Sequence, residues 1–289
     1  MKTLHIVPEL NEANGVYVVA RLLAREGGDA EVVGLDEGLR RIGEADVDEV
    51  WVHGMWLPKE WAACRRVLKA GKRLVRMTHG SLSPIYLKQQ GRWKKWLVGP
   101  IERHWLRKAD RIAATCGAEK AWIEAYLGKK CPKVVVEDVK RFFSLGDRSQ
   151  ELGVSESSAS GRALHLLYLG RRHPLKGLEY LEQAVEGIEG IELRIVSNAF
   201  GEKKEKVWDW CDVLVLPTLS ENFGLVVAEA LERGKRVITT DGAPAWEELG
   251  VSDQGVGVRG DELVYLRGFR DGSEAERVRL LKDALMMMV

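Results

Sequence analysis

The chain has 289 residues, of which 45% are hydrophobic and 30% charged, so it can bury one large core or two smaller ones, and disordered and fibrous classes are excluded. No run of about 18 apolar residues predicts a membrane span, and the polar start argues against a secretory signal. The 4 cysteines form no C-x-x-C pair, which argues against a zinc site or disulfides. We therefore expect a cytoplasmic protein.

Charge is distributed unevenly along the sequence. The formal net charge is only +1, but residues 1–150 contain 27 Lys and Arg against 19 Asp and Glu, whereas residues 151–289 contain 17 against 24. Within residues 59–111 the count is 15 basic against 3 acidic. This local patch predicts an anionic partner for the first half of the chain.

Short apolar runs alternate with segments of helical period through the first half. This alternation is typical of parallel sheets whose strands are joined by crossover helices. We expect strands at 3–7, 30–33, 49–53, 73–77, 111–114 and 133–136, and helices at 15–26, 59–70, 86–108 and 117–127.

A serine-rich stretch then separates two domains. Residues 151–163 contain little apolar content and predict a linker between a domain at 1–150 and another at 164–289. In the second domain we expect strands at 164–169, 191–196, 213–216 and 236–239, and helices at 177–187, 203–210, 224–233 and 273–286. The fold class is α/β, with two Rossmann-like, doubly wound parallel sheets that face a central cleft. The last helix could pack back on the first domain.

The strongest motif follows the strand at 213–216. Pro217 ends that strand, and a helix begins near Leu225, so the N–H groups of Phe223, Gly224 and Leu225 would be unpaired and suited to a phosphate. Glu221 and Glu229 flank Gly224 and could accept hydrogen bonds from sugar hydroxyls. Either glutamate alone would more often have only a structural role, but their joint placement after a buried strand favours a binding site.

A second motif follows the strand at 164–169. Gly170 to Gly177 contains Arg171, whose planar guanidinium can bind phosphate oxygens, and Lys176, a mobile point charge. A diphosphate could be bound in such a loop. Arg172 and His173 are interpreted as solvated loop residues.

These two motifs, together with residues 234–244, resemble the retaining glycosyltransferases of family 4, which have the GT-B fold. The resemblance implies that Arg171 and Lys176 bind the diphosphate of a nucleotide-sugar donor and act in catalysis. It assigns Glu221 to the transferred sugar and Glu229 to the ribose diol. The remaining donor-binding candidates of the second domain are Asn222, Phe223, Gly224 and Leu225.

The first domain carries further residues of this resemblance. Asn14 and Gly15 look like the family's glycine loop, which approaches the donor, and His79 resembles the histidine that faces the donor sugar near the reacting carbon. His53 and Trp56 are candidates for the acceptor side, with a structural role for His53 given equal weight. His5 and His165 lie inside expected strands and are interpreted as core or edge residues. No Asp-x-Asp metal motif occurs in a suitable strand context, so no metal or other cofactor is expected beyond the donor.

Two other segments need an interpretation. Within residues 86–111, aromatic and aliphatic residues recur at helical spacing and are expected to face the core: Trp93, Trp96, Leu97, Ile101 and Trp105. The basic residues between them are either solvated or contact an anionic membrane or a phosphorylated acceptor, whereas nucleic acid is not expected. Residues 255–260 match G-x-G-x-x-G but lack a following βαβ unit, so we interpret them as a turn.

The function that these patterns favour is transfer of a hexose from a nucleotide diphosphate sugar, with UDP favoured, and with retention of configuration. The acceptor would be a glycan or lipid-linked sugar of lipopolysaccharide or surface polysaccharide synthesis, at the inner face of a membrane. An inactive nucleotide-sugar-binding accessory protein of the same fold is the alternative. A sugar epimerase ranks last because no acid and base groups for it are identified.

Overall fold

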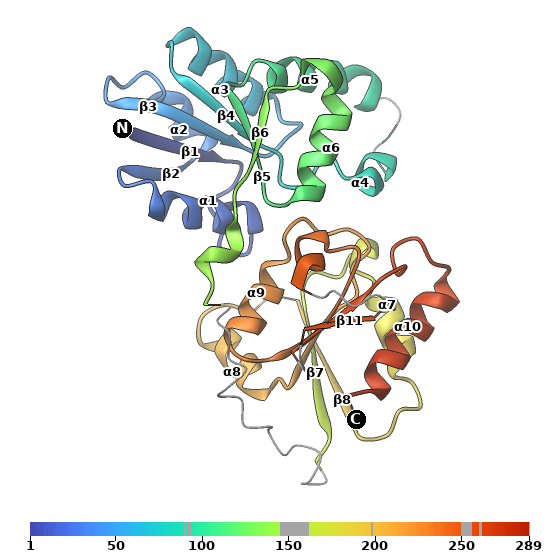
Figure 1. Cartoon of the computed structure of the whole chain (residues 1–289). Coiled ribbons are helices and arrows are strands. Elements are labelled where there is room, and N and C mark those ends of the chain that lie inside the picture. Colours follow the sequence, from blue (N-terminus) through green and yellow to red (C-terminus); the bar gives the residue numbers. More distant parts are fainter. Residues whose placement is uncertain are drawn as a thin grey trace. The chain divides into compact units, whose positions relative to one another are not determined.

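The computed structural model describes residues 1–89, 91, 94–144, 162–197, 199–249, 256–259 and 262–288. The chain forms two compact units, Met1–Phe142 and Phe143–Val289 (Figure 1). Most of the expected linker, up to residue 161, lies outside the described residues. The boundary at 150 and the linker therefore stay predictions.

The first unit contains a parallel sheet of six strands in the order β2-β1-β3-β4-β5-β6. All six expected strands are confirmed, because runs of Val, Ile and Leu buried on both faces favour central parallel strands. Their bounds are β1 (Lys2–Val7), β2 (Ala30–Gly34), β3 (Val47–His53), β4 (Arg73–Met77), β5 (Arg111–Ala114) and β6 (Lys133–Val136).

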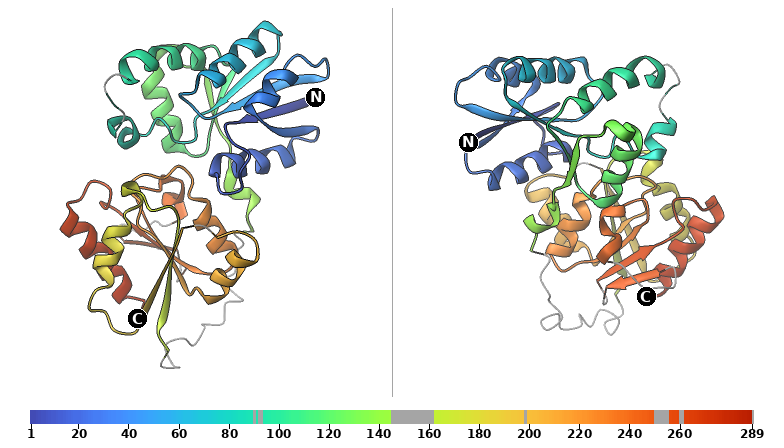
Figure 2. Two further views of the ribbon diagram at one scale, coloured as in Figure 1. Left: turned by 180° about the vertical axis from the view of Figure 1, so that it is seen from behind. Right: turned by 45° about the horizontal axis from the view of Figure 1, so that its top comes forward.

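Helices join these strands and cover both faces of the sheet (Figure 2). They are α1 (Gly15–Glu26), α2 (Leu35–Arg41), α3 (Pro58–Lys69), α4 (Pro84–Gln89), α5 (Gly99–Arg107) and α6 (Gly117–Leu127). The prediction of one helix over 86–108 is wrong: α4 ends at Gln89, and a π-helical segment η1 (Lys94–Val98) precedes α5. Gly99 and Pro100 explain the break before α5, because proline is accommodated only in the first turn of a helix.

The interpretation of the aromatic residues near α5 as core residues is also wrong in part. The exposed fraction is 80% for Trp96, 57% for Leu97 and 41% for Ile101, whereas Trp105 is half-buried and packs against the first core. Trp93 lies outside the described residues. The break before α5 ends the single helical register on which that interpretation depended.

The second unit contains a sheet of six strands in the order β11-β12-β10-β9-β7-β8. Five strands are parallel, and β11 pairs antiparallel with β12 at the edge. The interpretation of residues 255–260 as a turn is therefore wrong, because Val256–Arg259 forms a strand. The bounds are β7 (Leu164–Leu169), β8 (Ile191–Val196), β9 (Val213–Leu216), β10 (Arg236–Thr240), β11 (Val256–Arg259) and β12 (Leu263–Leu266).

The helices of the second unit follow the prediction closely. They are α7 (Leu178–Val185), α8 (Glu202–Trp210), α9 (Leu225–Glu232) and α10 (Glu274–Met286). The last of them begins at a capping box of Ser273 and Glu276, packs against α7 and buries three side chains in the second core: Leu281, Ala284 and Leu285.

Both units share one strand topology. In each sheet the first strand of the unit lies inside, between the second and the third strand, so that the strand order reverses at β1 and at β7. In open parallel sheets, ligands bind outside the carboxyl ends of the strands at such a reversal. The loops that follow β1, β3, β7 and β9 are therefore where each unit is expected to bind a ligand.

Candidate functional site

In the second unit, the loops after β7 and β9 are joined by hydrogen bonds. The hydroxyl of Thr218 and the N–H of Leu219 both donate to the carbonyl of Leu175, at 2.9 and 2.8 Å. The N–H of Glu221 donates to the carbonyl of Gly242, in the loop after β10, at 2.8 Å. Three loops thus fix the backbone of both motifs that the sequence predicted.

Two glycines make this close contact between loops possible. A Cβ on Gly177 would lie 2.0 Å from the carbonyl oxygen of Pro217, and the φ of Gly177 is +62°. A Cβ on Gly242 would lie 2.0 Å from the carbonyl oxygen of Thr218. Gly177, which follows Lys176, is therefore required by the close approach of the Pro217 backbone.

The charged side chains of the two motifs meet at this edge. Lys176 and Glu221 form an ion pair, and both are partly exposed. The Arg171 guanidinium, two residues after β7, has no hydrogen-bond or ion-pair partner within the described part of the chain. The Arg171 carbonyl accepts a hydrogen bond of 2.9 Å from the Tyr168 hydroxyl, which fixes the start of the loop. The structure thus brings two of the predicted residues into contact and leaves the third accessible.

The N-terminus of α9 lies beside this pair. Gly224 precedes the helix with a φ of +72°, and the N–H groups of Gly224 and Leu225 donate no hydrogen bond within the described residues. The N–H of Asn222 donates to Glu221 Oε1 at 3.1 Å. Phe223 is only 3% exposed and packs against Trp246, so its side chain is a structural support, and only its backbone could meet a ligand.

Glu229 has a partner that the sequence did not reveal. Lys204 of α8 binds this carboxylate, with Nζ 2.8 Å from Oε1. Nothing in the sequence separates Lys204 from its neighbours Lys203 and Lys206 on the same charged helix. A ligand hydroxyl that binds Glu229 would therefore share the carboxylate with Lys204 or displace it.

In the first unit, three histidines form a continuous chain of hydrogen bonds. His5 Nδ1 lies 2.9 Å from His53 Nε2, and His53 Nδ1 lies 2.8 Å from His79 Nε2. His5 was expected to have only a core role, so its part in this chain was missed.

The strand register explains how the three rings meet. β1 pairs His5 with Trp51, two residues before His53, and β3 pairs His53 with Met77, two residues before His79. Because side chains in a strand alternate with a period of two, His5 and His53 lie on the same face of the sheet, and His79 follows in the loop just beyond the carboxyl end of β4.

Burial keeps these imidazoles neutral. It lowers the pKa of His5 to about 4 and the pKa of His79 to about 3, and burial together with the neighbouring histidines holds the pKa of His53 well below its usual range. A neutral imidazole has one N–H and one acceptor nitrogen, so the tautomers of the three rings are coupled. Because His53 is fully buried, it can affect a ligand only through His79.

Glu119, a buried residue of α6, holds the loop that contains His79. Its carboxylate accepts hydrogen bonds from the Thr78 hydroxyl at 2.7 Å and the Gly80 N–H at 2.6 Å. It also accepts from the N–H and the hydroxyl of Thr115, each at 2.8 Å. These contacts support a φ of +49° at His79, a conformation that non-glycine residues rarely adopt. The position of Glu119 in the first turn of α6 gave no sign of this role.

The loop after β3 has a similar buried support. Trp56 has a φ of +81° and is 9% exposed, and its backbone N–H donates to Glu102 at 3.1 Å. Glu102 forms an ion pair of 2.6 Å with Arg76, and both side chains are fully buried. Nearby, burial raises the pKa of Glu60 to about 7. The loop that follows His53 is thus fixed by a buried charge pair.

Asn14 and Gly15 lie at the start of α1, after β1. The Asn14 side chain accepts a hydrogen bond of 3.0 Å from the Val16 N–H and so caps the helix. No group of three or more His, Cys, Asp or Glu side chains that could hold a metal ion occurs among the residues that the structure describes. Among these same residues, no helix combines the length and the apolar character that crossing a membrane requires.

Comparison with known proteins gives a family match for each unit. The family model for glycosyl transferases group 1 matches residues 156–262, and the model for the glycosyl transferase 4-like domain matches residues 7–137. No curated protein sequence is significantly similar to the chain.

Solved structures share the fold along the whole chain. HepE of Anabaena, solved in complex with UDP, is 15% identical with a TM-score of 0.61, over 100% of this chain and 91% of its own. Sucrose-phosphate synthase of Thermosynechococcus elongatus is 13% identical with a TM-score of 0.64, over 99% and 90%. An α,α-trehalose-phosphate synthase (UDP-forming) of Burkholderia vietnamiensis is 11% identical with a TM-score of 0.62, over 99% and 92%. The two α/β units have the GT-B fold.

Proposed function

Because the chain belongs to the glycosyltransferases that combine a 4-like domain with a group 1 domain, we propose that it transfers a hexose from a UDP-sugar. The observation that carries this proposal is the ion pair of Lys176 and Glu221, together with the accessible Arg171, in the loops at the strand-order reversal of the second sheet. Similar structures that contain UDP, or UDP and glucose, support UDP as the nucleotide.

The second unit would supply the charge that the reaction needs. As the bond from the sugar to the diphosphate breaks, negative charge grows on the phosphate oxygens, and fixed cations stabilise it. Lys176 would leave its ion pair with Glu221 and bind a phosphate oxygen of the donor. The accessible Arg171 guanidinium would bind a second phosphate oxygen. The unpaired N–H groups of Gly224 and Leu225 would add donors at the N-terminus of α9. Glu221, released from Lys176, would accept hydrogen bonds from the sugar hydroxyls.

The first unit would orient the transferred sugar through His79. A pKa of about 3 makes this imidazole a poor proton acceptor near neutral pH, so it would form a directed hydrogen bond and would not remove a proton. His53 and His5 would fix which nitrogen of His79 carries the hydrogen. We further propose retention of configuration, as in the family that the motifs resemble.

The acceptor would be a glycan or lipid-linked sugar of surface polysaccharide or lipopolysaccharide synthesis, bound by the first unit. The basic segment at 59–111 and the exposed Trp96 support a location at the inner face of a membrane. They would bring the enzyme to acceptors that are attached to lipid.

A second candidate is an accessory protein that binds a nucleotide sugar without transferring it. The ion pair between Lys204 and Glu229 favours this alternative, because it occupies the carboxylate assigned to the ribose. The accessible Arg171 and the pair of Lys176 and Glu221 favour the enzyme.

Release of nucleoside diphosphate separates the two candidates. The full chain is incubated with UDP-, GDP-, ADP- and TDP-hexoses, with Arg171→Ala and Glu221→Gln as test variants. Arg172→Ala is the matched control, because this exposed neighbour pairs only with Glu182 among the described residues, at 3.4 Å. The proposal predicts release from the UDP-sugar that both test variants lose and the control keeps. Binding of the donor without release would favour the accessory protein, and no binding of any donor would contradict both.

A further inference from the structure

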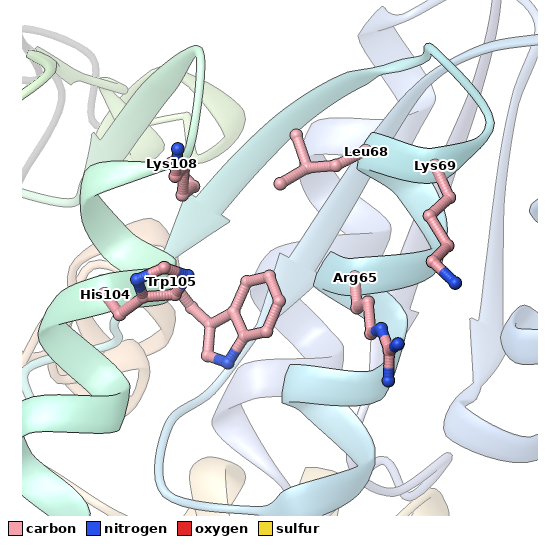
Figure 3. A pocket seen from close by; sticks show the side chains of 6 residues that line it. All are labelled: Arg65, Leu68, Lys69, His104, Trp105 and Lys108. Atoms are coloured by element: carbon pink, nitrogen blue, oxygen red, sulfur yellow. The ribbon is translucent and has the colours of Figure 1, made fainter.

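A basic pocket lies between α3 and α5 of the first unit, apart from the residues assigned to the reaction. Its volume is about 320 Å³. Arg65, Leu68 and Lys69 line it from α3, and His104, Trp105 and Lys108 from α5 (Figure 3). Figure 3 shows the indole of Trp105 projecting into the space between the two helices, with Lys108 on the α5 side and Arg65 and Lys69 on the α3 side.

The pocket and the histidine chain lie at opposite edges of the sheet. α3 ends just before β4 begins, and α5 ends just before β5 begins, so residues in the last turns of these helices lie near the start of the strands. His53 instead ends β3 at its carboxyl end, and His79 follows the carboxyl end of β4. A ligand in the pocket therefore does not compete with a sugar at His79.

The cations of the pocket have no carboxylate partner. Within the part of the chain that the structure describes, Arg65, Lys69 and Lys108 form no hydrogen bond or ion pair through their side chains. Two of the three acidic residues of the segment 59–111, Glu60 and Glu102, are fully buried. The ends of two helices contribute about half a negative charge each, which three cations exceed. The pocket is therefore electropositive and open to an anion.

Exposed apolar side chains occur on α5 and on the segment that precedes it. Ile101, His104, Trp105 and Lys108 recur at spacings of three and four and so share one face of α5, whereas Glu102 and Leu106 on the opposite face are buried. Before the start of α5, the π-helical segment η1 carries two further exposed apolar side chains, Trp96 and Leu97. Tryptophan and aliphatic side chains next to cations are typical of helices that lie in a membrane interface.

From the unpaired cations of the pocket and the exposed apolar side chains on α5 and the segment before it, we propose that the pocket binds the phosphate group of an anionic phospholipid, while Trp96, Leu97 and Ile101 enter the lipid interface. Arg65, Lys69 and Lys108 would bind the phosphate oxygens, and Leu68 and Trp105 would contact the glycerol and the first acyl carbons. The inference deepens the membrane location in the proposed function. It is tested without a donor sugar, so its failure is distinct from failure of the transferase proposal.

The test is sedimentation of the full chain with vesicles of phosphatidylcholine alone or mixed with phosphatidylglycerol. We expect binding to the mixed vesicles, and about a 25-fold weaker partition for Lys69→Ala/Lys108→Ala, if each cation contributes about fivefold. The control Arg25→Ala/Arg279→Ala removes the same charge from exposed positions that do not line the pocket, and it should keep most of the binding. Lys69→Arg/Lys108→Arg keeps the charge and should restore binding, which shows that the alanine variant fails for lack of cations.

Three results would overturn the inference. The native chain could fail to sediment with the mixed vesicles. The pocket and control variants could lose binding equally, which would reduce the effect to overall charge. Soluble glycerol phosphate, titrated without vesicles, could bind the pocket as strongly as lipid does, which would identify it as a site for a free phosphate ester. Conversely, weaker partition of Trp96→Ser/Ile101→Ser with unchanged binding of soluble phosphate ester would support the apolar half of the inference.

Discussion

At the carboxyl edge of the first sheet the polar groups are buried and hydrogen-bonded to one another, whereas at the carboxyl edge of the second sheet they are charged and partly exposed. His53, Glu102 and Glu119 are all fully buried in the first unit. Lys176 and Glu221 in the second unit keep 18% and 22% of their side-chain surface exposed. The same strand topology thus supports a rigid array in one unit and exchangeable ion pairs in the other.

The difference suggests how the two units divide the work. A buried network has a single arrangement and costs several kcal/mol to disrupt, so it suits a group that must hold one orientation. A partly exposed ion pair contributes little to stability, so its members can release each other for a charged ligand. Substitutions should therefore reduce stability in the first unit and activity in the second.

The largest effect is expected for the buried charge pair. Glu102→Ala leaves Arg76 as an unpaired buried charge and should lower the free energy of unfolding by about 3–5 kcal/mol. Denaturant unfolding measures this. Glu37→Ala, which removes a partly exposed ion pair with Arg41, is the control and should cost less than about 1 kcal/mol. Equal losses in the two variants would contradict the contrast between buried and exposed pairs.

In the second unit the large effect should appear in turnover. Lys176→Met removes the cation that we propose binds the leaving diphosphate, and it should reduce the rate of UDP release by about 10²–10³-fold. The free energy of unfolding should change by less than about 1 kcal/mol, because the pair with Glu221 is partly exposed. A variant that is strongly destabilised but releases UDP at the native rate would show that Lys176 supports the fold and does not act in the reaction.

The histidine chain predicts that stability falls with acid. The folded pKa values of about 4 for His5 and about 3 for His79 lie below that of an unfolded histidine, near 6.5, so the unfolded state binds protons first. Their contribution is complete above pH 6.5 and is lost as the pH falls toward 4, by roughly 1 kcal/mol per pH unit for each histidine.

Unfolding curves between pH 7 and pH 4.5 measure this slope. His5→Phe should make this slope less steep by the contribution of one histidine. A slope that stays the same in His5→Phe would show that His5 titrates normally in the folded protein.

The smallest effect is expected at Glu229, which we propose binds the ribose of the nucleotide. Glu229→Gln removes a charged hydrogen-bond acceptor and should weaken UDP binding by about tenfold, in line with roughly 1.5 kcal/mol for a charged hydrogen bond. Titration calorimetry with UDP checks this. The control is Glu205→Gln. Glu205 lies on α8 and forms an ion pair with Arg233 at the end of α9, so this variant should bind UDP as the native chain does.

The sequence predicted most strands because Val, Ile and Leu runs are local signals, and it placed the two motifs of the second unit beside strand ends. It missed α2, β11 and β12, which are short, and joined α4, η1 and α5 because helical spacing continued across Gly99 and Pro100. The histidine chain could not be predicted, because residues 5, 53 and 79 meet only through the register of three strands. The partners Lys204 and Glu119 depend in the same way on packing between distant elements.

The central claim is that the second unit binds a nucleoside diphosphate through Lys176. Calorimetric titration of the native chain and of Lys176→Met with UDP and with UMP tests it most directly. The account predicts that the native chain binds UDP at least tenfold more tightly than UMP and that Lys176→Met loses this difference while still binding UMP. Equal affinity of the native chain for the two nucleotides, or an unchanged preference for UDP in Lys176→Met, would contradict it.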